Sequence, residues 1–167
     1  MSLPTAFISV VMIWSTTPLA IKWSALGAGA SFALLARMAI GTLLCALLLW
    51  ALRVRFPLHR TARLTYLAAG LSMFGAMSLT YWASQRVNSG LISVLFGLSP
   101  LMTSLGAAYW LREEALTPNK LVGMGLGLAG LALVFHSSLD LGPGALVGIG
   151  VLLIAVLLQS LGMVWIK

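Results

Sequence analysis

Long apolar stretches alternate along the chain with short groups of charged residues. Uncharged runs cover residues 1–21, 64–85, 87–111, 121–139 and 141–166, and a shorter run covers 38–52. A helix that crosses the roughly 30 Å hydrocarbon core of a bilayer needs about 20 mostly apolar residues. Five runs reach that length, and the sixth reaches it when extended back through Arg37 to Ser31. The pattern predicts six membrane-spanning helices, at about 4–22, 31–52, 64–85, 90–111, 118–136 and 145–166.

Composition agrees with this interpretation. Of the 167 residues, 60% are hydrophobic and 8% are charged. A soluble domain of this size has too little interior to bury so large an apolar share, which excludes a soluble enzyme or nucleic-acid-binding module. Runs such as LLCALLLWAL lack the alternation of transmembrane β-strands. The predicted fold class is an all-α integral membrane protein.

Charged residues gather at the ends of the predicted spans, with an uneven distribution of sign. Lys22, Arg37 and Arg86 lie on one side of the bilayer. The other seven of the ten basic residues lie on the opposite side: Arg53, Arg55, Arg60, Arg63, Arg112, Lys120 and Lys167. Because positively charged loops are retained in the cytoplasm, we expect a multi-pass protein of the cytoplasmic (inner) membrane with both termini cytoplasmic. The net charge of +7 then reflects topology and predicts no nucleic-acid partner.

Small residues recur at helical spacing inside two of the spans. In the third span, small residues occupy every fourth position: Ala68, Ser72, Ala76, Thr80 and Ser84. The fifth span contains Gly123 and Gly127 as a GxxxG pair, with Gly130 near by. Helices associate in bilayers by close approach at small residues, so these positions are predicted to pack.

Two prolines lie inside predicted spans. Pro18 lies in the first span and Pro100 near the middle of the fourth. Proline removes a backbone hydrogen bond, so each is predicted to kink its helix. Such a kink either is structural or, as in many transporters, helps to build a binding site.

The first and sixth spans resemble each other. Residues 11–22, VMIWSTTPLAIK, align without gaps with residues 156–167, VLLQSLGMVWIK, and four of the twelve positions are identical. The offset covers five spans, and an odd number of spans inverts the second copy in the membrane. Inverted repeats are typical of secondary transporters, whose binding sites lie near the membrane midplane at the repeat interface.

Several segments resemble one transporter family. MIWSTTPLAIKW is similar to the first-helix signature of the EamA domain of the drug/metabolite transporter superfamily, and FALLARMAIG is similar to the start of its second helix. The stretch from Tyr81 to Phe135 adds Pro100, Glu114 and a glycine-rich fifth helix where the family has them. The resemblance implies ten helices in two inverted five-helix repeats that export metabolites, amino acids or toxic compounds.

The same resemblance implies a division of the chain. Residues 1–143 would form the first repeat, and residues 144–167 the first helix of an incomplete second repeat. The expected partners are the lipid bilayer, a small-molecule substrate, and a missing carboxy-terminal half or second transporter chain. The alternative is a non-transporting membrane subunit or an inactive, truncated transporter half.

Few polar residues inside the spans are candidates for contact with a solute. Trp14 and Gln159 occupy equivalent positions in the two repeat copies, and a buried amide such as that of Gln159 needs a partner. That partner is either a neighbouring helix or a solute. Arg37 is either an interfacial anchor or a lining residue of an outer vestibule, and Lys22 is interpreted as an anchor. Tyr81 is either an aromatic-belt anchor or, with Thr17, Ser93 and Ser99, part of a central cavity across which Trp14 and Gln159 face each other. The candidate substrate path comprises Trp14, Thr17, Arg37, Tyr81, Ser93, Ser99 and Gln159.

The sequence predicts no enzymatic activity, metal site or cofactor. The spans contain no HExxH motif, no paired aspartates and no pair of serine and histidine, so a membrane-embedded enzyme, a metal site and a cofactor are not expected. Cys45, the single cysteine, is interpreted as a small residue at mid-span.

Overall fold

The computed structural model describes residues 3–54, 56–110, 117–135 and 144–166. Every regular element in these ranges is an α-helix, which confirms the predicted all-α class for the described residues. The helices follow in the order α1 (Leu3–Ala28), α2 (Ala30–Ala51), α3 (Arg60–Ala83), α4 (Ser89–Phe96), α5 (Ser99–Trp110), α6 (Pro118–Phe135) and α7 (Ala145–Trp165).

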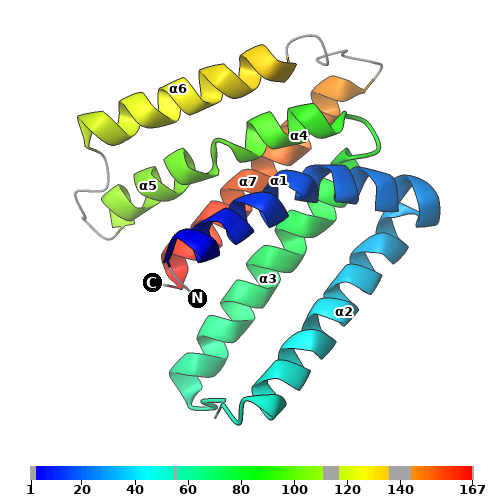
Figure 1. The fold of residues 1–167 in the computed structure, drawn as a ribbon, viewed down its shortest axis with the longest axis vertical. Helices are drawn as coiled ribbons and strands as arrows, with labels where there is room; N and C mark the ends of the chain where they lie inside the picture. Colours follow the sequence, from blue (N-terminus) through cyan, green and yellow to red (C-terminus); the bar gives the residue numbers. More distant parts are fainter. Residues whose placement is uncertain (1–2, 55, 111–116, 136–143, 167) are drawn as a thin grey trace.

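Helix α7 forms the centre of the packing. Its most extensive interface is with α3, and α5 packs against it as well. Figure 1 shows α2 beside α3, with α5 and α6 together at the opposite end of the molecule. Helix α1 contacts α2 through a turn at Gly29, whose φ of 83° is accessible to glycine at no steric cost. Helix α7 therefore packs against α3, α4 and α5, whereas α1 and α2 join the molecule through α3 and α4.

Small residues bring α3 and α7 together. Ala76 and Thr80 of α3, like Leu152 and Ala155 of α7, are fully buried. A Cβ atom on Gly148 would lie 2.8 Å from Cγ1 of Val87, and one on Gly162 would overlap the Ser72 side chain. The two backbones approach closely enough that no side chain fits at these glycines.

Among the described residues, four segments are long and apolar enough to cross a membrane: Pro4–Gly27, Ala30–Ala51, Ser89–Trp110 and Ala145–Trp165. The chain is thus a multi-pass membrane protein. Helix α3 carries Arg60 and Arg63 in its first turn, and α6 has only 18 residues and begins with Pro118, Asn119 and Lys120. The spans expected at 64–85 and 118–136, and with them the count of six, stay predictions.

The helices differ from the predicted spans at two places. Helix α1 continues past Lys22 to Ala28, because the charged end of Lys22 is hydrogen-bonded to protein carbonyls and does not end the helix. The fourth span is divided at Gly97 and Leu98 into α4 and α5, and Pro100 is the second residue of α5. Pro18 lies inside the continuous α1. Arg55, Arg112, Glu113, Glu114, Asp140 and Lys167 lie outside the described residues.

Candidate functional site

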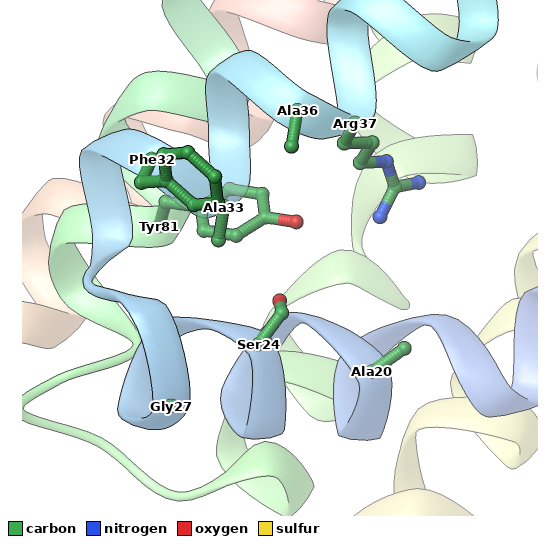
Figure 2. A pocket seen from close by; sticks show the side chains of 8 residues that line it. All are labelled: Ala20, Ser24, Gly27, Phe32, Ala33, Ala36, Arg37 and Tyr81. Carbon is green, nitrogen blue, oxygen red and sulfur yellow. The ribbon is translucent and has the colours of Figure 1, made fainter.

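A groove of about 520 Å³ opens between α1 and α2 and ends against α3 (Figure 2). Its lining residues are Ala20, Ser24 and Gly27 from α1, Phe32, Ala33, Ala36 and Arg37 from α2, and Tyr81 from α3. Residues three or four positions apart share one face of a helix, so each helix presents a single strip of lining residues. Most of these residues are small, which leaves the space between the helices open.

Three polar side chains face this groove. The Tyr81 ring is buried at 3% exposure, and Figure 2 shows its hydroxyl directed into the groove. Ser24 Oγ donates a hydrogen bond to the carbonyl oxygen of Ile21 at 3.1 Å, and Arg37 extends its guanidinium along the groove edge. Within the described residues, no hydrogen bond or ion pair occupies the Arg37 guanidinium or the Tyr81 hydroxyl. The groove is therefore mostly apolar along its walls and contains two polar groups, the Arg37 guanidinium and the Tyr81 hydroxyl, that have no partner among the described residues.

Further buried polar atoms lie on α5 and α7, which pack against each other. Gln159 is buried at 8% exposure, and Ser160 Oγ donates a hydrogen bond to the Ser99 carbonyl at 3.4 Å. Gln159 Oε1 and Ser99 Oγ are buried and have no hydrogen-bond partner among the described residues. An unsatisfied buried polar group costs about 1–3 kcal/mol, so a water molecule or a polar ligand is the expected partner.

The other sequence candidates lie apart from these two places. Trp14 is 63% exposed on α1. Thr17 Oγ1 donates to the Ile13 carbonyl at 2.9 Å, and Ser93 Oγ donates to the Ser89 carbonyl at 3.0 Å. Serine and threonine commonly satisfy their hydroxyls within their own helix in this way. The structure therefore groups Arg37 with Tyr81 and brings Ser99 to the helix that carries Gln159.

Comparison with known proteins decides the family. The chain matches the EamA-like transporter family over residues 3–136. It belongs to that family. No curated protein and no solved structure matches it. The family match confirms the resemblance inferred from the sequence motifs. EamA is a family of transporters and is not an enzyme family.

Sequence reasoning missed one contact in this EamA chain. Lys22 Nζ donates to the carbonyl oxygens of Ser84, at 2.6 Å, and Val87, at 2.7 Å. Ser84 is the C-cap of α3, where backbone carbonyls lack helical partners and the helix dipole favours a cation. Lys22 thus ties α1 to the end of α3. Sequence reasoning also missed the groove residues Ser24 and Ala33. The spacing of three or four positions between small residues on α1 and on α2 is a signal that could have found them.

The glycines of α6 have open surroundings in the described part of this EamA chain. A Cβ atom on Gly123, Gly127 or Gly130 would meet no other atom within 4 Å. Their role in helix packing stays a prediction. Among the described residues, no group of three or more His, Cys, Asp or Glu side chains forms a candidate metal site.

Proposed function

We propose that this EamA chain belongs to an exporter that moves small metabolites, amino acids or toxic compounds across the cytoplasmic membrane. The family match over residues 3–136 carries the proposal. The groove supports it, because apolar walls with a few convergent polar groups are typical of sites for small amphipathic molecules.

The proposed transporter has two inverted repeats. Residues 1–143 form the first repeat and residues 144–167 begin the second, with the remaining helices supplied by a carboxy-terminal half or a second chain. One observation supports this division: the family match ends at residue 136, before α7. Both termini are cytoplasmic in this proposal, as the distribution of arginine and lysine favours.

The proposed substrate path includes the groove and the polar atoms on α5 and α7. Solute would meet Arg37 and Tyr81 at the outer end and Ser99 and Gln159 deeper in the protein. Trp14, Thr17 and Ser93 complete the path when the second set of helices is present. Alternating access then follows from rocking of one repeat against the other around a shared site.

Transport by reconstituted protein tests the proposal. We expect residues 1–167 to insert stably into liposomes and to move solute only when co-expressed with a polypeptide that carries four further helices of opposite orientation. Counterflow of a panel of labelled amino acids and aromatic acids, compared with empty liposomes, is the measurement. Absence of counterflow for the paired chains would assign the protein to a non-transporting membrane role. Saturable counterflow by residues 1–167 alone would overturn the need for a second repeat.

A further inference from the structure

We infer that the groove between α1 and α2 binds small amphipathic anions, with a carboxylate or similar acidic group held by Arg37. The inference rests on the proposed function and names the substrate class of that site. It starts from the charges of the groove. Arg37 is the one basic side chain among the lining residues, none of which is acidic, and the other polar side chains, Ser24 and Tyr81, carry hydroxyls.

Within the described part of the chain, the Arg37 guanidinium makes no hydrogen bond and no ion pair. Lys22 adds no donor to the groove, because its ammonium group is bound to the carbonyls of Ser84 and Val87. A guanidinium that has no partner among the described residues, in the same groove as the Tyr81 hydroxyl, offers directional donors to an anion and repels a cation.

The apolar walls of the groove indicate what the uncharged part of the ligand is like. Phe32, Ala33 and Ala36 of α2 face Ala20 and Gly27 of α1, so the body of the ligand meets carbon atoms on both sides. A volume of about 520 Å³ accommodates a molecule of the size of an aromatic or short-chain acid. An acid with one charged end and a flat apolar body matches both parts of the groove.

Phenylacetate is a suitable probe, with phenylacetamide as its neutral analogue and phenethylamine as its cationic one. Binding to residues 1–167 in dodecyl maltoside is measured by saturation-transfer NMR, with protein-free micelles subtracted. We expect phenylacetate to bind at least tenfold more tightly than either analogue. Arg37→Gln should weaken phenylacetate binding at least tenfold and Tyr81→Phe about threefold, in line with the loss of a charge-assisted and a neutral hydrogen bond.

Arg86→Gln is the matched control. It removes the same charge from the same predicted side of the membrane, but Arg86 lies over the Trp82 ring, 3.6 Å from its centroid, and does not line the groove. We expect this variant to keep phenylacetate affinity within twofold. Equal binding of the amide and the acid, or unchanged affinity in Arg37→Gln, would overturn the inference.

A lipid phosphate is the other source of an anion for Arg37. Adding phosphatidylglycerol to the micelles separates the two sources. Binding of this lipid that depends on Arg37, with no binding of phenylacetate in its absence, would overturn the solute inference and assign the groove to lipid. Because the measurement is made at equilibrium, its result is independent of transport. Anion binding without counterflow contradicts the proposed function alone, whereas counterflow of neutral or cationic solutes without anion binding contradicts this inference alone.

Discussion

Arg53 adopts a backbone conformation that is uncommon for any residue other than glycine. Its φ is 52°, and it follows α2 as the residue after the C-cap Leu52. The amide of Arg53 donates to the Trp50 carbonyl at 3.2 Å, and that of Val54 donates to the Leu49 carbonyl at 3.1 Å. This pair of bonds is the Schellman motif, in which glycine is favoured at the left-handed position. Arg53 therefore has a strained backbone conformation, and its charge adds to the excess of basic residues on the predicted cytoplasmic side.

Arg53→Gly is therefore predicted to stabilise the fold. Relief of the left-handed conformation is worth about 1–2 kcal/mol, and the added flexibility of glycine in the unfolded chain offsets about 0.5–1 kcal/mol of this. We expect a net gain of about 0.5–1 kcal/mol over Arg53→Ala, which removes the same charge but keeps the strain. Unfolding in mixed micelles of dodecyl maltoside and sodium dodecyl sulfate measures the difference. An alanine variant as stable as the glycine variant would contradict the prediction.

Lys22 shows how a single residue changes the interpretation of an element. A charge at the edge of an apolar run is normally a sign that the span has ended, which is why the sequence predicts an end at residue 22. The structure continues α1 to Ala28 because the ammonium of Lys22 reaches the unpaired carbonyls at the end of α3. Sequence spacing reveals no such partner, since Ser84 and Val87 lie more than 60 positions away.

At the scale of elements, sequence periodicity identified the buried face of α3. Ala76, Thr80 and Ser84 have 0% exposure, as their spacing of four residues predicts for a packed stripe. The same reasoning selected Gly123 and Gly127 of α6, yet a Cβ atom on either would meet no atom of a neighbouring segment within 4 Å. Periodicity defines which residues share a face, but it contains no information about which helix meets that face. The α3–α7 partnership therefore came from the structure alone.

The glycines of α7 provide a test of this interface. We expect Gly148→Ala to destabilise the protein by about 1–3 kcal/mol, because its new methyl group would lie 2.8 Å from Val87 Cγ1 and 3.3 Å from Arg86 Cβ. Gly150→Ala is the matched control on the same helix. It has open space at its Cβ position, so alanine should stabilise the helix by about 0.5–1 kcal/mol.

Unfolding of the two variants in mixed micelles gives the comparison. A Gly148→Ala variant that is as stable as Gly150→Ala would show that α7 does not approach Val87 as closely as the structure has it. Such a result would also contradict the close packing of α7 that the structure shows at Gly148.

At the scale of the whole molecule, the sequence identified the family and the all-α class but named only two of the residues that line the groove. The motifs around Trp14 and Pro100 were sufficient for the family, because they are local sequence patterns. The groove depends on how α1, α2 and α3 meet, so Arg37 and Tyr81 were selected while Ser24 and Phe32 were not. Trp14 was selected because it aligns with Gln159 in the repeat. That alignment gives no information about burial, and the Trp14 side chain is 63% exposed.

The basic residues predict an orientation for the whole chain. Seven of the ten lie at predicted span ends of one side, and four of these, Arg53, Arg55, Arg60 and Arg63, fall between α2 and the first turn of α3. Because positively charged segments are retained in the cytoplasm, we expect a green fluorescent protein fused after residue 63 to fluoresce. Alkaline phosphatase, which is active only outside the cytoplasm, should be active when fused after residue 138.

The same fusions in a variant with Arg53, Arg60 and Arg63 changed to glutamine supply the control. Removing three of the seven charges leaves four against three, so we expect the variant to insert in both orientations and both reporters to lose part of their activity. Active phosphatase after residue 63 in the unmodified chain would contradict the orientation. It would also place Arg37 on the cytoplasmic side, where the groove between α1 and α2 would receive solute from the cell interior instead of releasing it to the outside.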